Sequence, residues 1–373
     1  MAKSVCIADV CKEIFAGGDV PKSALSYEKT AEYNVPIFSN GEKNCGLYGY
    51  TNNARVKEPS ITVSARGTIG YTAIRTEPFV PVVRLITLTP KSEVIDLDYL
   101  FYATQNYRFE GSGTSIPQLT VPMLKKYKFP LPEMSHQKAI AVKFEKLDQL
   151  ISLRKQQLAK LDELVKARFV EMFGSYPENE NAYPVVNVSD IANASVGVVI
   201  KPAQYYVTEE CGIKAFRSLN IGEMYIKDSE WVYFSTEGNE SNKKSQLHEN
   251  DLLIVRSGAP GTSCVVTKEF EGCNAVDVII AHPDLSKVNP WYLCAYINYP
   301  HGKKQIEEGT GGAAQQHFNV GKCNNLKILL PPLALQNQFA AFVERVYRQK
   351  QTVQQSLEKL ELMKKALMQE CFG

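Results

Sequence analysis

The chain has 373 residues, and its 42 lysine and arginine residues against 40 aspartate and glutamate residues give a formal net charge of +2. This length exceeds the usual size of one domain and predicts two or three. Hydrophobic residues at 44% and charged residues at 22% exclude general disorder and low-complexity repeats. The balance of charge excludes a strongly basic, autonomous nucleic-acid binder, so any contact with nucleic acid must be local or assisted.

The cysteines and the N-terminal residues indicate the cellular compartment in which the protein acts. Nine cysteines are scattered without a Cys-x-x-Cys pair, and neither Cys6 with Cys11 nor Cys264 with Cys273 has the usual zinc spacing. Residues 1–6 contain no apolar signal core, and no apolar run approaches the length of a membrane span. We therefore expect a cytoplasmic protein with reduced thiols, no metal site and no membrane segment.

Residues 1–133 have the pattern of a mixed α/β domain. Residues 60–64 and 82–88 have the apolar, β-branched composition of strands, and residues 98–103 are typical of a short helix. A glycine-rich turn, Arg66-Gly67-Thr68-Ile69-Gly70, follows the first of these strands. The sequence therefore predicts short strands joined by polar loops, not a doubly wound parallel sheet.

Residues 134–174 form a predicted spacer helix. Pro132 and Ser135 give start signals and Gly174 a stop signal. A helix of roughly 38 residues at ~1.5 Å per residue spans on the order of 55 to 60 Å. Its apolar residues repeat with the spacing of a coiled-coil seam: Phe144, Leu147, Ile151, Leu158, Leu161 and Val165.

The second half of the chain repeats the first. At a constant offset of 199 residues, Gln137 aligns with Gln336 and Phe173-Gly174 aligns with Phe372-Gly373. Residues 175–332 are therefore a second domain, with strands expected at 251–255 and 275–280 and a helix at 290–296. Residues 333–373 are a second spacer helix, whose seam residues are Val343, Val346, Val353, Leu357, Leu360 and Leu367.

A long helix with a narrow apolar seam needs a partner, and the other copy in the same chain provides one. The chain must leave the first domain along one helix and return along the other, so the pair is expected to be antiparallel. The predicted class is α+β: two similar mixed α/β domains separated by a two-helix coiled coil with approximate twofold symmetry. The alternative is two separate helices, each packed on its own domain.

Local signatures of catalysis are missing from the sequence. Gly309-Thr310-Gly311-Gly312 lacks the Lys-Ser/Thr ending of a phosphate-binding loop, and Ser257 lacks a full Gly-x-Ser-x-Gly elbow. No catalytic residues are predicted. A duplicated hydrolase or transferase would need an acid, base or nucleophile cluster assembled in space.

Polar and basic loop residues in both domains are candidates for contacts with DNA, because Arg, Asn, Gln and Lys bind phosphates and base edges. For each residue taken singly, solubility explains its polarity better than a contact with DNA does. Their occurrence at matching landmarks favours the group, which comprises Lys43, Asn44, Arg55, Arg66, Thr114, Ser115 and Gln118 in the first domain and Arg217, Asn220, Lys243, Lys244, Arg256, Gln315, Gln316 and His317 in the second.

The order of variable domain, helix, variable domain and helix resembles the specificity subunits of type I restriction–modification systems. The first half carries Ser115-Ile116-Pro117-Gln118-Leu119, then Lys128-Phe129-Pro130-Leu131-Pro132 and His136-Gln137. The second half carries Gln316-His317-Phe318-Asn319, then Leu329-Leu330-Pro331-Pro332 and Leu335-Gln336. The turn with Arg66 and the segment 251–258 are similar to the strand and turn of the family's target-recognition domains.

The resemblance implies a non-catalytic subunit that recognises double-stranded DNA. Each variable domain would recognise one half of a bipartite asymmetric target, and the helix pair would set the spacing and bind two methyltransferase subunits. Restriction subunits would complete the complex. The resemblance implies no cofactor on this chain, with S-adenosylmethionine, ATP and Mg²⁺ bound by partner subunits. The alternative is a coiled-coil scaffold that binds proteins and no DNA.

Overall fold

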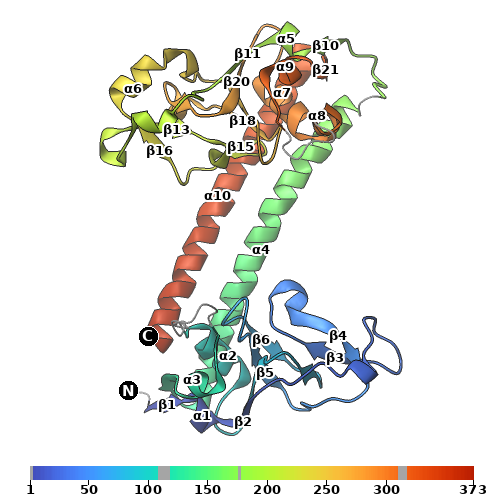
Figure 1. Ribbon diagram of the computed structural model, residues 1–373, viewed down its shortest axis with the longest axis vertical. Helices are drawn as coiled ribbons and strands as arrows, with labels where there is room; N and C mark the ends of the chain where they lie inside the picture. The colour runs from blue at the N-terminus through green and yellow to red at the C-terminus, as the bar shows by residue number, and fades with distance from the viewer. Residues whose placement is uncertain (1–2, 108–117, 175–177, 310–316) are drawn as a thin grey trace. The chain divides into compact units, whose positions relative to one another are not determined.

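A computed structural model describes residues 3–107, 118–174, 178–309 and 317–373. The chain forms two compact units (Figure 1). Unit 1 contains residues 1–155 and 354–373, and unit 2 contains residues 156–353. The two long helices, α4 (Met134–Phe173) and α10 (Leu333–Phe372), each contribute to both units.

Unit 1 is built on an antiparallel sheet with strand order β2-β8-β5-β6. Its central strand β5 is fully buried, and helix α2 packs against β5 and β6 (Figure 1). The strands are β2 (Cys11–Ala16), β8 (Ile86–Pro90), β5 (Ser60–Val63) and β6 (Thr72–Arg75), and the helix is α2 (Leu97–Gln105).

A second, smaller sheet in unit 1 has the order β4-β3-β7, in which β3 and β7 run parallel. Strand β1 pairs with β9 next to the start of α4. These elements are β1 (Lys3–Cys6), β3 (Val35–Phe38), β4 (Leu47–Thr51), β7 (Val80–Pro81) and β9 (Lys128–Leu131), with short helices α1 (Ile7–Val10), η1 (Lys22–Ala24), η2 (Lys43–Gly46) and α3 (Val121–Lys125).

Unit 2 repeats this topology. Its main sheet has the order β11-β20-β17-β18, the second sheet β12-β16-β13-β19 contains the matching parallel pair of β13 and β19, and β10 pairs with β21. The strands are β10 (Val185–Asn187), β11 (Ala192–Val196), β12 (Tyr206–Val207), β13 (Ile213–Phe216), β14 (Ile221–Gly222), β15 (Tyr225–Ile226), β16 (Val232–Phe234), β17 (Leu252–Val255), β18 (Ser263–Val265), β19 (Asn274–Ala275), β20 (Val278–Pro283) and β21 (Lys327–Leu329).

Short helices complete unit 2. They are α5 (Val188–Ile191), η3 (Pro202–Tyr205), η4 (Glu209–Cys211), η5 (Ser218–Asn220), α6 (Thr236–Ser241), η6 (Lys243–Ser245), η7 (Lys268–Phe270), α7 (Pro290–Asn298), α8 (Pro300–Gly309) and α9 (Val320–Asn324). The predicted class, mixed helix and sheet with two long helices, is confirmed.

The repeat extends to individual hydrogen bonds. Buried Gln137 accepts from the backbone of Asp96 (2.9 Å) and donates to the carbonyl of Pro132 (2.9 Å). In unit 2, buried Gln336 accepts from Asn289 (2.8 Å) and donates to Pro331 (2.8 Å). Each amide satisfies backbone groups between the sheet domain and the first turn of its helix, which explains why glutamine recurs at this position.

Within each unit, the segments of α4 and α10 run antiparallel. In unit 1, Lys364 pairs with Asp148 (2.5 Å) and Lys155 pairs with Glu361 (3.2 Å). In unit 2, Lys350 pairs with Asp162. The helices therefore contact one another in both units, so the alternative of two unpaired helices is wrong. The seam residues are buried or half-buried along both helices, and the residues between them are mostly exposed.

The helix ends belong to the cores of the sheet domains. In unit 1, Phe144 and Phe372 are buried with the rings 5.9 Å apart. In unit 2, Phe169 and Phe173 near the end of α4 are buried beside Phe339 of α10. Gly174, with φ of +71°, then ends α4 in the left-handed conformation that glycine adopts without strain.

Two predicted strands are shorter than the sequence pattern indicates. The segment 82–88 is a strand only from Ile86, because Val83 and Arg84 have positive φ and turn the chain. The segment 275–280 is likewise broken at Asp277, whose φ is +51°. Apolar composition predicted one continuous strand in each case, whereas residues with positive φ delay the start of β8 and separate β19 from β20.

Neither long helix, nor any other helix in the described ranges, has a stretch long and apolar enough to cross a membrane.

Candidate nucleic-acid interface

The turn after β5 in unit 1 holds Arg66 at the surface. Gly70 donates to the carbonyl of Ser64 (2.9 Å), and the backbone of Leu119 donates to the carbonyl of Ala65 (3.0 Å). These bonds bring the segment that begins at Gln118 next to the turn. The exposed guanidinium of Arg66 donates through Nη2 to Oε1 of Gln118 (3.0 Å).

The turn after β17 in unit 2 has the same backbone hydrogen bonds. Gly261 donates to the carbonyl of Val255 (3.0 Å), and Phe318 donates to the carbonyl of Arg256 (2.9 Å). The side chain of Ser257 then lies 2.9 Å from Nδ1 of His317. The two turns are therefore one structural element that occurs once in each unit.

This correspondence changes the residue alignment between the two turns. Matching hydrogen bonds pair Ala65 with Arg256, Arg66 with Ser257 and Gln118 with His317. The sequence analysis placed both arginines at corresponding turns, and the structure puts them one position apart within that turn. Each unit thus presents the same scaffold with a different pair of side chains.

Arg256 lies partly below the surface, with its side chain 14% exposed. It donates through Nη1 to Asp277 (2.5 Å), and its Nη2 lies 2.6 Å from Nε2 of His317. A guanidinium only donates, so Nε2 of His317 accepts and Nδ1 carries the proton that is donated to Ser257. The contacts fix both the orientation and the tautomer of His317.

Other candidates of unit 1 lie on neighbouring loops. Lys43 and Asn44 are exposed in η2, and Arg55 is exposed with its guanidinium carbon 4.1 Å from the centre of the Phe15 ring. The loop before η2 is tied to the Arg66 turn, because Asn40 accepts from the backbone of Ala65 (2.7 Å). Asn40 is a positioning residue that the sequence analysis missed, although an Asn-Gly pair is a known turn signal.

The candidate residues between β13 and β17 in unit 2 differ in their exposure to solvent. Lys243 and Lys244 are exposed in η6, and Lys243 pairs with Glu240 (2.9 Å). Arg217 is half-buried and donates to the carbonyl of Glu230 (2.6 Å).

Asn220 is fully buried, and both ends of its amide are occupied by backbone groups of Arg217 and Ser229. It holds this loop and cannot reach a ligand, so its assignment to the DNA-binding set is corrected. Thr114, Ser115, Gln315 and Gln316 lie outside the described residues.

Asp277 is a second residue that the sequence analysis missed. Its carboxylate is half exposed and accepts from Arg256, and it occupies the left-handed position between β19 and β20. Its position inside an apolar run gave the only sequence signal, since an acidic residue there marks a break in the strand. By pairing with Arg256, Asp277 holds the guanidinium beside His317.

A cavity of about 680 Å³ in unit 2 adjoins the turn that carries Ser257. Gly258 and Ala259 of the turn line it together with Lys166 of α4 and Tyr347 of α10. Ser257, Gly258 and Ala259 are exposed, so the turn is accessible from solvent.

Comparison with known proteins identifies related chains. The family model described as the type I restriction modification DNA specificity domain matches residues 2–163 and 172–362. A protein of Mycoplasma pneumoniae named as a putative type I specificity subunit is 36% identical over 163 residues, which cover 41% of this chain and 44% of that protein. The match thus covers less than half of that protein's length.

Two more distant comparisons cover more of the chain. The type I restriction enzyme EcoBI specificity subunit of Escherichia coli is 19% identical over 315 residues, which cover 77% of this chain and 66% of that protein. The crystal structure of a type I restriction-modification system S subunit from M. genitalium matches with a TM-score of 0.64 and 15% identity. This match covers 100% of this chain and 96% of that one, and supports the fold.

Proposed function

The chain belongs to the type I restriction modification DNA specificity family, and we propose that its two units each recognise one half of a bipartite, asymmetric DNA target. The observation that carries this proposal is the repeated turn. The same backbone scaffold presents Arg66 with Gln118 in unit 1, and Ser257 with His317 and Arg256 in unit 2. Equal scaffolds with unequal side chains suit a target with two unequal halves.

The side chains at the turns have the chemistry of base recognition. Arginine donates two parallel hydrogen bonds to guanine, and glutamine pairs with adenine through one donor and one acceptor. Arg66 and Gln118 hold one another in the free protein, and each has further donors for a base edge. Lysine and arginine on adjacent loops, such as Lys43 and Lys244, would bind phosphates and fix the position of the duplex.

The proposal extends to the rest of the complex. The chain itself would be non-catalytic and act in the cytoplasm, with two methyltransferase subunits and restriction subunits as partners. S-adenosylmethionine, ATP and Mg²⁺ would be bound by those subunits. Exposed apolar side chains on the long helices support a docking role: in unit 1 these include Leu150 and Leu153, and in unit 2 Leu164 and Val170.

Substitution of the turn arginines tests this function. We expect Arg66→Ala, and separately Arg256→Ala, to weaken binding of the target duplex by the chain with its methyltransferase partner by about 1–3 kcal/mol. Arg66 is exposed, so its replacement should change the free energy of unfolding by less than about 0.5 kcal/mol. Fluorescence anisotropy with labelled duplexes at several salt concentrations measures the effect and its kind, because loss of a phosphate contact lowers the dependence of affinity on salt, whereas loss of a base contact relaxes sequence preference.

A matched control is Lys128→Ala, which removes an exposed cation from β9. Its affinity should stay at the wild-type value. If the chain were a protein-binding scaffold, it would show no sequence-dependent affinity for any duplex. Unchanged affinity in both arginine variants would reject the assignment of these two turns to DNA binding.

A further inference from the structure

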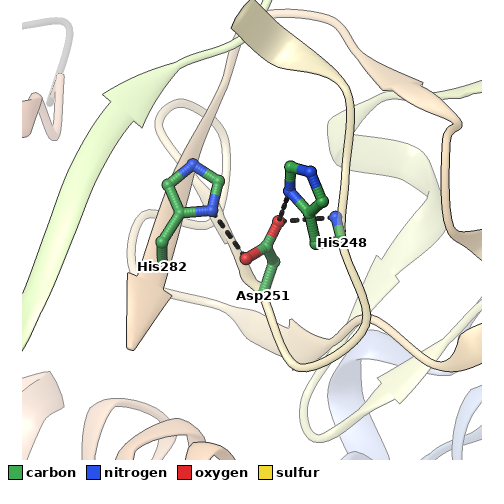
Figure 2. Close-up of side chains that lie close together, drawn as sticks. All are labelled: His248, Asp251 and His282. Atoms are coloured by element: carbon green, nitrogen blue, oxygen red, sulfur yellow. Dashed lines mark hydrogen bonds and ion pairs between the residues drawn. The ribbon is translucent and has the colours of Figure 1, made fainter. Parts of the chain in front are cut away.

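Three side chains that can bind metal converge at one end of the main sheet of unit 2. Figure 2 shows the carboxylate of Asp251 between the imidazole rings of His248 and His282. Nδ1 of His282 lies 2.6 Å from Oδ1 of Asp251, and Nδ1 of His248 lies 3.6 Å from Oδ2. One ligand atom from each residue lies within 4.8 Å of the other two.

The local fold holds these residues in place. Buried Leu247 is fixed by backbone hydrogen bonds with Gly272 and Cys273, so His248 follows an anchored residue. The backbone of His248 donates to Oδ2 of Asp251 (2.7 Å), and Asp251 donates back to the carbonyl of His248 (3.1 Å). The turn between them is closed by its own hydrogen bonds, which orients the first two residues before any ligand binds.

Unit 1 shows that the fold does not require charged groups at this position. Asp251 directly precedes β17 and lies opposite His282 of β20, one step beyond the pair of Leu252 and Ala281. The matching position on β5 and β8 holds Ser60 and Thr89, whose hydroxyl oxygens lie 3.0 Å apart. A neutral pair therefore suffices in one copy, and the second copy has a carboxylate and two imidazoles instead.

We propose that His248, Asp251 and His282 form a binding site for a divalent transition metal ion of the Zn²⁺ class. Two imidazole nitrogens and one carboxylate oxygen are a ligand set that such ions prefer, whereas Mg²⁺ and Ca²⁺ prefer oxygen ligands alone. No lysine or arginine of the described ranges forms an ion pair with Asp251, whose side chain is only 5% exposed. Its partners are the imidazoles of His248 and His282, and a metal ion held by all three side chains would place a positive charge beside this carboxylate.

Metal binding needs only small side-chain movements. Zn²⁺ lies about 2.0–2.1 Å from its ligand atoms, so three atoms within 4.8 Å must move closer together. The His248 side chain is 68% exposed and free to rotate toward the carboxylate. The exposure of His248 leaves the site open to the ion and to water as a fourth ligand.

The site is separate from the turn that carries Ser257 and His317. Asp251 precedes β17 and Arg256 follows it, a separation of about 16 Å at ~3.3 Å per residue. A metal ion would bind the loop at His248 to strand β20 and stabilise unit 2. The proposal thus does not depend on which DNA bases the chain recognises.

Zinc titration of the full chain, without a polyhistidine tag and after chelator treatment, tests the site. We expect one equivalent of Zn²⁺ to bind in competition with a chromophoric chelator, in the presence of millimolar Mg²⁺. Affinity should fall by at least ~10-fold in His248→Ala, since loss of even an outer-shell partner costs that much. At the same concentration of Zn²⁺, the rise in melting temperature should be smaller in His248→Ala than in the wild-type chain.

The double variant Asp251→Ser with His282→Thr is the matched control for folding, because it installs the pair that unit 1 carries. It should remain folded by circular dichroism and lose the site. His136→Ala, which removes an exposed histidine of α4, should bind zinc as the wild type does. No zinc binding by the folded wild type, or equal binding by all variants, for instance through the exposed thiols of Cys45 and Cys211, would overturn the proposal.

Discussion

Phe169→Ala should destabilise unit 2 by about 3–5 kcal/mol, the range for removing a fully buried phenylalanine from a core. Phe169 is completely buried, and its ring centre lies 5.0–5.6 Å from those of Phe173, Tyr292 and Phe339. Alanine would leave a cavity where α4, α7 and α10 meet. Hydrogen exchange is the appropriate measurement, because it reports the free energy of opening separately for each unit.

Leu153→Ala is the control, since this side chain lies on the same helix and is 58% exposed. It should change the free energy of unfolding by less than about 0.5 kcal/mol. Phe144→Ala should produce the corresponding loss in unit 1, where Phe144 stacks on Tyr102 with ring centres 4.7 Å apart. Equal protection of unit 2 amides in Phe169→Ala and wild type would show that the helix end is not part of its core.

Lengthening both long helices by one heptad should change the length of DNA spacer that the complex prefers. Duplicating residues 149–155 in α4 and 347–353 in α10 inserts seven residues at the boundary between the units and preserves the seam. Each helix grows by ~10 Å. Because the base pairs of a duplex rise ~3.4 Å each, the preferred spacer should grow by up to about three base pairs. Selection of bound duplexes from a pool with randomised spacers measures the preferred spacer length.

The bases preferred in each half should stay the same in the lengthened chain, since the turns themselves are unchanged. The matched control inserts the heptad in α10 alone, which places the two helices out of register and should reduce binding at every spacer length. An unchanged preferred spacer in the folded double insertion would contradict a role of the helix pair in setting the spacing.

The sequence predicts the long helices well, because their signals are local. Capping residues, a final glycine and an apolar seam all lie within the segment that they define, and α4 ends at Phe173, directly before Gly174. The same seam pattern did not include Phe169. This residue lies beyond Val165, the last predicted seam residue, and is buried by α7, an element distant in sequence.

The candidate interface was harder to predict, because it depends on loops of different length in the two halves. The offset of 199 residues that aligns the helices does not apply to the turns, where Ser64 and Val255 correspond at an offset of 191. The structure supplies this register through repeated backbone hydrogen bonds. Without it, the two arginines appeared equivalent, and buried Asn220 could not be distinguished from an exposed polar residue.

The cluster of His248, Asp251 and His282 shows the same limit for metal sites. Two members lie three residues apart in a turn, but the third comes from β20 and is positioned by the strand pairing of β17 with β20. Linear spacing rules find ligands within one loop or helix, so a site assembled across strands gives no such signal.

Selection of bound duplexes with two randomised half-sites tests the central claim most directly. The chain together with the methyltransferase subunit that we propose as its partner should enrich two different half-sites. Gln118→Ala should then relax base preference in one half only, and His317→Ala in the other half only, because each residue belongs to a different unit. Enrichment of no sequence, or relaxation of the same half by both variants, would contradict recognition of a bipartite target by two separate units.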